Sequence, residues 1–94
     1  MRGVSRRRLA DEAGLRQRIA ADPKDFAARL ELGRALAATQ RHEDALALLL
    51  EVIRGSAAHT EDARKAVLDV FELLGPRHAL TQQFRKQLAQ ALFR

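Results

Sequence analysis

The sequence of 94 residues contains no cysteine, no tryptophan and no tyrosine. Without cysteine the chain has no disulfide framework, no thiolate ligand for zinc and no thiol nucleophile. Without the two missing aromatic residues it cannot stack a base or a sugar on either ring. No apolar run approaches the roughly 18 residues that cross a membrane, and the N-terminus lacks the apolar stretch of a secretory signal. We therefore expect a cytoplasmic protein without a membrane span.

The composition favours helix throughout the chain. Alanine and leucine, both strong helix formers, dominate the 47% hydrophobic fraction, while β-branched aliphatic residues are few. The length supports one small domain with a thin core. The spacing of apolar residues predicts five helices with short connections, so that neighbouring helices pack antiparallel. They are expected over residues 9–21, 23–39, 42–54, 60–74 and 77–93.

Local signals predict where several of these helices begin and end. Asp22 is expected to cap the second helix, with Pro23 at its first position. Thr60 is expected to cap the fourth helix. Gly55 is placed to adopt the left-handed conformation after the third helix, and Gly75-Pro76 is a strong stop signal for the fourth.

The net charge of +5 is concentrated at the two ends of the chain. Residues 1–10 carry four arginines and no acid, and residues 77–94 carry four basic residues and no acid, whereas residues 11–76 carry 9 bases against 12 acids. A basic end attracts nucleic acid or acidic proteins at low salt. We predict that residues 1–8 form a basic, solvated, disordered tail and that residues 9–94 form a single helical domain.

The second and third predicted helices carry the most specific pattern in the chain, formed by Leu32, Gly33, Leu36, Ala45 and Leu49. Glycine has no local advantage inside a helix, so Gly33 predicts a close approach of a neighbouring helix. The pattern resembles a tetratricopeptide (TPR) unit, a helix–turn–helix of about 34 residues with small residues where its helices cross. Leu36 departs from it, since tyrosine is common there. The resemblance implies an all-α, TPR-like right-handed superhelical array of about five antiparallel helices.

Further stretches are similar to a closer family, the chaperedoxin-type proteins, which are bacterial thioredoxin-like co-chaperones with a C-terminal TPR-like helical domain. These stretches are Leu15-Arg-Gln-Arg-Ile19 before Asp22-Pro23, Leu30-Glu-Leu-Gly33, Glu43-Asp-Ala45-Leu-Ala-Leu-Leu49, and Arg64-Lys65 with Leu73-Leu-Gly75 followed by Phe84-Arg-Lys-Gln-Leu88. The resemblance implies a protein-binding domain that takes unfolded clients and passes them to the chaperonin and to DnaK-type chaperones. The thioredoxin half of such proteins is absent from this sequence, which leaves open whether one belongs upstream.

No residue pattern predicts catalysis. The histidines, His42, His59 and His78, lie far apart in the sequence and form no pair with the spacing of zinc ligands. No serine lies in a nucleophile elbow. The acidic pairs lie near helix starts, where the helix dipole favours them. We therefore expect a non-enzymatic protein that needs no cofactor and no metal.

Two faces are candidates for partner binding, namely the inner face of the second helix and the purely basic last helix. Together they supply the candidate residues Ala27, Leu30, Arg34, Ala37, Arg77, Arg85 and Lys86. The first face lacks the asparagine and lysine of TPR grooves that grip a C-terminal carboxylate, so it suits unstructured or helical segments instead. An equal alternative is that Leu30 and Ala37 pack on the first helix. For the basic residues, the alternative is a solvated face without a partner.

Two other functions are alternatives to protein binding. Nucleic-acid binding through the basic ends is disfavoured, because the body of the chain is net acidic and no turn presents a clear recognition helix. Homodimerisation is the other alternative, since the end helices of a short solenoid can expose apolar residues such as Leu92 and Phe93.

Overall fold

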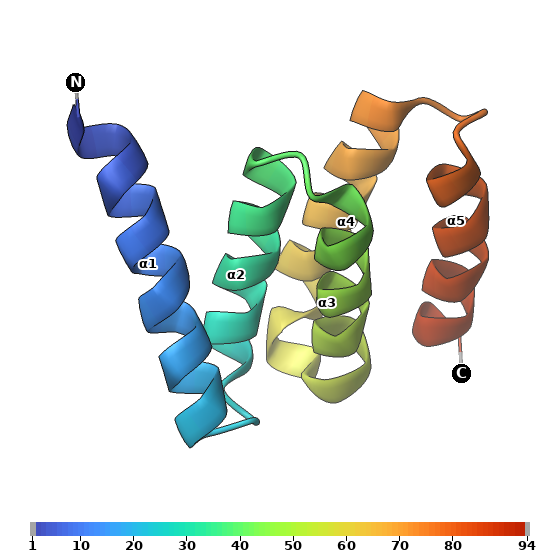
Figure 1. Cartoon of the computed structure of the whole chain (residues 1–94). Coiled ribbons are helices and arrows are strands. Elements are labelled where there is room, and N and C mark those ends of the chain that lie inside the picture. Colours follow the sequence, from blue (N-terminus) through green and yellow to red (C-terminus); the bar gives the residue numbers. More distant parts are fainter. Residues whose placement is uncertain (1, 94) are drawn as a thin grey trace.

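The computed structural model describes the backbone of residues 2–93 and the side chains of residues 11–93. The described part contains five α-helices and no strand. The helices are α1 (Arg2–Ala21), α2 (Phe26–Ala38), α3 (His42–Gly55), α4 (Thr60–Leu74) and α5 (Ala79–Leu92), with a 3₁₀ turn η1 (Ala57–His59) before α4. Consecutive helices run antiparallel (Figure 1), so the predicted all-α array of five helices is confirmed.

Helix α1 begins earlier than the apolar spacing predicted. Its backbone is helical from Arg2, whereas the predicted start is Leu9. The side chains of residues 2–10 lie outside the described part, and so does all of residue 1. The division into a basic tail of residues 1–8 and a domain of residues 9–94 therefore stays a prediction.

Helix α2 is capped by Asp25, not by Asp22 as predicted. The Asp25 carboxylate accepts the Ala28 N–H at 3.0 Å and is held by the Arg18 guanidinium at 3.2 and 3.3 Å. The Ala28 N–H first, and Arg18 after it, lower the pKa of Asp25. Asp22 instead shapes the preceding turn, because its carboxylate accepts the Lys24 N–H at 3.0 Å. Both aspartates are good capping residues, and the helix uses the second.

Two other predicted helix ends are wrong, and one is as predicted. Gly55 is the last residue of α3 and has no positive φ; the ring of Phe26 packs where a Cβ on Gly55 would lie. Thr60 is the first residue of α4 rather than its cap, because its hydroxyl donates back to the Ser56 carbonyl oxygen at 2.9 Å. Gly75 ends α4 with a φ of 93°, a conformation that favours glycine.

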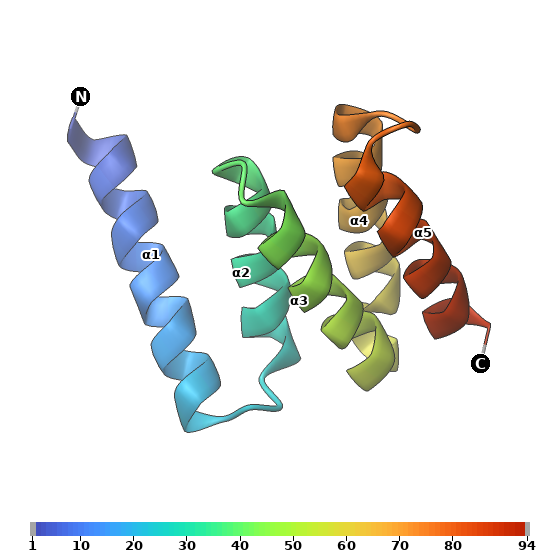
Figure 2. The same ribbon diagram turned by 45° about the vertical axis from the view of Figure 1, so that its right-hand side comes forward.

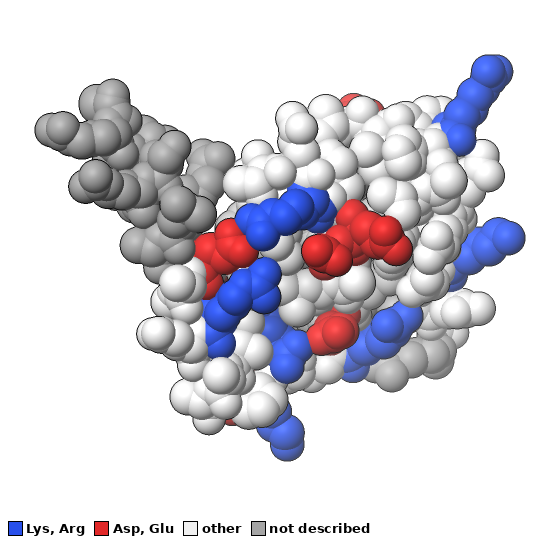
Figure 3. All heavy atoms as spheres, viewed as in Figure 1, with Lys and Arg blue, Asp and Glu red and all other residues white. Residues whose placement is uncertain are grey.

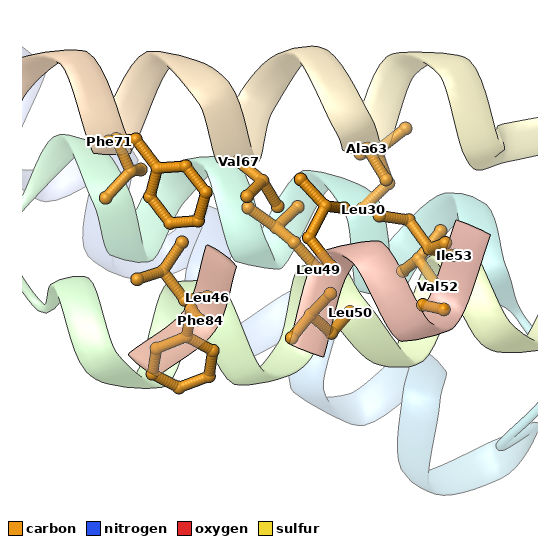
Figure 4. Packing of buried hydrophobic residues seen from close by; sticks show 13 residues of the cluster. Leu30, Leu46, Leu49, Leu50, Val52, Ile53, Ala63, Val67, Phe71 and Phe84 are labelled. Carbon is orange, nitrogen blue, oxygen red and sulfur yellow. The ribbon is translucent and has the colours of Figure 1, made fainter. Parts of the chain in front are cut away.

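The core consists of two clusters of buried side chains. The larger joins α2, α3, α4 and α5 (Figure 4) and includes the fully buried Leu46, Leu49 and Leu50. The smaller joins α1, α2 and α3 and contains Leu15, Ala28, Leu32, Leu36 and Ala45. Because α2 and α3 both contribute side chains to the two clusters, this pair of helices is the centre of the fold.

Helix α3 lies very close to α2 at Gly33. A Cβ built on Gly33 would lie 2.6 Å from Leu49 Cδ2 and 2.8 Å from Leu49 Cγ. Real side chains do not approach so closely, and Leu49 is fully buried with little room to move. The missing side chain of Gly33 thus allows the two helices to cross at this distance.

From α2 onward, each helix also packs on the helix after next. Helix α2 contacts α4, and α3 contacts α5. Within the described residues the backbone of α1 lies close to that of α2 but not to that of α3, although Leu15 of α1 and Ala45 of α3 share the smaller cluster. Both ribbon views show α1 at one end of the array, beside α2 (Figure 2). The packing pattern therefore breaks at the start of the array, and one side of α3 is left uncovered.

Candidate interaction surfaces

The positions of the TPR-like pattern all lie in the interior. Leu32, Leu36 and Ala45 belong to the smaller core cluster, and Leu49 belongs to the larger one. Gly33 is buried and faces Leu49. These residues hold α2 against α3, so none of them is accessible to a partner.

Helix α2 exposes less of its predicted binding face than expected. Leu30 is only 5% exposed and belongs to the larger cluster, and the half-buried Ala37 packs against both clusters. Leu30 therefore packs within the larger cluster rather than on the first helix and is not accessible to a partner, whereas Ala37 is covered only in part. Ala27 and Arg34 are exposed and stay candidates.

The predicted basic residues of the last helix are exposed. Arg77 lies in the turn that precedes α5, while Arg85 and Lys86 lie on α5 itself; we call these three residues the basic end. Helix α5 begins later than predicted, after His78, whose Nδ1 accepts the Leu80 N–H at 3.0 Å and caps the helix.

Ion pairing separates the basic end from most other basic side chains. Five arginines elsewhere pair with carboxylates, namely Arg16, Arg18, Arg29, Arg41 and Arg64. Within the described residues, neither Arg34 nor any residue of the basic end makes an ion pair. Helices α2 and α5 do not touch. Arg34 and the basic end are thus two separate surfaces with uncompensated positive charge.

A hollow that the sequence analysis missed lies between α1 and α3. It has a volume of about 470 Å³, and the buried Leu32 and Leu36 of α2 contribute its floor. Charged side chains of both signs gather over this part of the surface (Figure 3). One signal was available in the sequence, because Ala47 and Leu48 interrupt an otherwise acidic side of α3. The full lining is Arg16, Ile19, Ala20, Arg29, Leu32, Leu36, Asp44, Ala47, Leu48 and Glu51.

Ion pairs lie beside this hollow. Glu12 of α1 pairs with Arg41, just ahead of α3, at 2.5 Å and with Arg16 at 3.2 Å. The hydrogen bond from Arg41, and after it that from Arg16, lowers the pKa of Glu12 below its usual range. Arg29 of α2 pairs with Glu51 of α3 at 2.6 Å. The Glu12 carboxylate is therefore charged at neutral pH and ties α1 to the connection between α2 and α3.

The described residues include no group of three or more histidine, aspartate or glutamate side chains that could hold a metal ion. The same part of the chain has no helix with the length and apolar character needed to cross a bilayer.

A protein-family model described as a tetratricopeptide repeat matches residues 5–93. The match includes α2 to α5 completely and most of α1. No curated protein and no solved structure matches the chain.

Proposed function

The chain belongs to the tetratricopeptide-repeat family, and we propose that it is a non-enzymatic protein-interaction module whose basic end binds an acidic segment of a partner protein. Tetratricopeptide repeats generally mediate contacts between proteins. The observation that supports the basic end as the contact is its lack of ion pairs within the described residues, where five other arginines are paired. Exposed charge of one sign steers association with a partner of opposite sign.

Arg34 supplies a second contact in this proposal. It is exposed on α2, together with the nearby Ala27. Because α2 and α5 do not touch, Arg34 contacts a different segment of the partner from the one at the basic end. A partner that reaches both surfaces gains affinity through the two linked contacts.

The stretches that resemble chaperedoxin-type proteins support a finer form of the proposal. In this form the partners are unfolded client proteins and a chaperonin or DnaK-type chaperone of the bacterial cytoplasm. The exposed charge of the basic end suits weak, exchangeable contacts, which a protein that hands clients on requires.

Binding to purified chaperonin and to a purified DnaK-type chaperone, measured by biolayer interferometry at physiological salt, tests the proposal. The test variant is Arg85→Gln with Lys86→Gln. Its control is Lys24→Gln with Lys65→Gln, which also removes two positive charges, but from exposed lysines outside the proposed surface. We expect the test variant to weaken binding about three- to tenfold, because each exposed ion pair contributes modestly. The control should stay close to the parent chain.

A second readout uses light scattering from a test protein diluted out of guanidinium. The parent chain should slow its aggregation, and the test variant should slow it less than the control does. Equal binding by both double variants would contradict the role of the basic end. If the chain binds neither chaperone but binds random duplex DNA with a steep salt dependence, the protein-binding proposal is wrong and the basic end is a nucleic-acid contact.

A further inference from the structure

The hollow between α1 and α3 lies where the repeating pattern of the array fails. The backbones of α2 and α4 approach closely, and so do those of α3 and α5, but within the described residues those of α1 and α3 do not. The seams of the first two pairs are filled by side chains of the larger core cluster. At the third seam Leu15 of α1 and Ala45 of α3 are buried in the smaller cluster and the half-buried Ile19 and Leu48 pack against it, but an open space remains beside them.

The floor of the hollow is apolar. Leu32 and Leu36 are almost fully buried beneath it, while Ile19 and Leu48 expose part of their side chains at its sides. A volume of about 470 Å³ lies within the range of roughly 300–1,000 Å³ that is common for binding pockets. Covering such a floor removes apolar surface from water, which favours an apolar side chain as the occupant.

The α3 side of the hollow is acidic. Asp44 and Glu51 lie on that side about 10 Å apart along the helix, with Ala47 and Leu48 between them. Glu51 is paired with Arg29, whereas Asp44 is exposed and makes no ion pair within the described residues. The two arginines of the lining, Arg16 and Arg29, are paired with Glu12 and Glu51, so the Asp44 carboxylate is the group on this side that is left to bind a cation, although the whole chain carries +5.

From this geometry we infer that the hollow binds an amphipathic helix of a partner protein. The apolar stripe of that helix covers Leu36, Ile19 and Leu48, and a lysine or arginine beside the stripe pairs with Asp44. This is a helix-in-groove mode, in which apolar anchors provide affinity and flanking charges set orientation. The site is separate from the basic end and has the opposite charge preference, so it does not depend on the function proposed above.

The probe is a short fluorescein-labelled peptide of leucine and lysine with leucine at helical spacing, i, i+3, i+4 and i+7. Its counterpart carries glutamate in place of every lysine. Anisotropy at physiological salt measures the affinity of both peptides for the full chain. We expect the lysine peptide to bind more tightly. The overall charge of +5 opposes this order, so the result reports the local chemistry of the hollow rather than general attraction.

Two variants locate the binding, each with a matched control. Asp44→Asn should weaken lysine-peptide binding about two- to fivefold. Asp62→Asn should leave it unchanged, since Asp62 holds the same exposed position in the first turn of α4. Ala47→Phe fills the hollow and should abolish binding, whereas Ala89→Phe on the exposed side of α5 should not. Circular dichroism establishes that each variant is folded.

Several results would overturn the inference. One is tighter binding of the glutamate peptide, and another is an equal affinity of the Asp44 and Asp62 variants. A chain that sediments as a dimer and becomes a monomer with Ala47→Phe would show that a second copy occupies the hollow instead. Loss of lysine-peptide binding in Arg85→Gln with Lys86→Gln would place the peptide on the basic end, not in the hollow.

Discussion

Replacing Gly33 with alanine tests the close crossing of α2 and α3. The added methyl group would lie 2.6 Å from Leu49 Cδ2 and 2.8 Å from Leu49 Cγ. Movement of a terminal methyl alone cannot relieve this overlap, because the branching carbon is also too close. Leu49 is fully buried in the larger cluster, so the helices must separate or Leu49 must leave its preferred rotamer.

Two opposing effects set the expected magnitude for Gly33→Ala. Alanine is favoured over glycine inside a helix by about 1 kcal/mol. Overpacking a full core costs about 1–3 kcal/mol. The overlap involves two heavy atoms of a side chain with no exposure, which places the cost in the upper part of this range. We therefore expect Gly33→Ala to lower the free energy of unfolding by about 1–2 kcal/mol.

A second background reverses the expected sign. Leu49→Ala alone should cost about 2–5 kcal/mol, because it leaves a cavity. In that background the methyl of Gly33→Ala enters free space and retains its helix-forming advantage, so it should stabilise the chain by about 1 kcal/mol. The two substitutions must therefore couple strongly in a double-mutant cycle, as contacting residues do.

Urea unfolding followed by far-ultraviolet circular dichroism measures these changes, since the chain has no tryptophan or tyrosine to report by fluorescence. Gly14→Ala is the control, because a Cβ built at Gly14 meets no described atom within 4 Å apart from its chain neighbours and the backbone of its own helix. It should stabilise the chain by about 0.5–1 kcal/mol through helix propensity alone. The reasoning is refuted if Gly33→Ala stabilises the parent chain as much as Gly14→Ala does.

Two further predictions concern Asp25 and Glu12. Asp25→Ala removes the acceptor of the Ala28 N–H and should lower Tm by about 4–8 °C. Asp22→Ala removes no helix cap and should lower Tm less, and thermal unfolding of the two variants compares these falls. The hydrogen bond from Arg41 lowers the pKa of Glu12, so the stability that Glu12 contributes is present above its unfolded pKa of about 4.3 and is lost as the pH falls through the lower folded value. Glu12→Gln should therefore show a smaller fall in Tm than the parent chain between pH about 6 and about 3, and identical falls would show that this ion pair has no effect on stability.

The choice of helix ends shows where local sequence signals are ambiguous. Asp22 and Asp25 are both good caps, and only the folded chain places Arg18 and the Ala28 N–H at Asp25. Glycine often adopts the left-handed conformation after a helix, which made Gly55 a candidate for it. The ring of Phe26, far away in sequence, instead occupies the space beside Gly55. In both cases a neighbour from another segment decided between local options of similar energy.

The candidate surfaces divide in a similar way. The exposure of Arg34 and of the basic end could be predicted, because charged side chains on the polar side of a helix are expected to stay in water. The burial of Leu30 could not, because helical spacing shows that a residue lies on a stripe but not which neighbour covers it. The hollow between α1 and α3 escaped prediction because it depends on how closely the backbones of two segments distant in sequence approach each other.

The sequence by itself determined the all-α class, the number of helices, their antiparallel order and the family pattern at Gly33. These properties follow from helix propensity, apolar spacing and glycine placement, all of which act within a few residues. The tertiary structure alone decided which apolar residues are covered, which basic residues are left unpaired and where α1 separates from α3. The physical reason is that burial and ion pairing belong to pairs of segments, and their energies exist only once those segments meet.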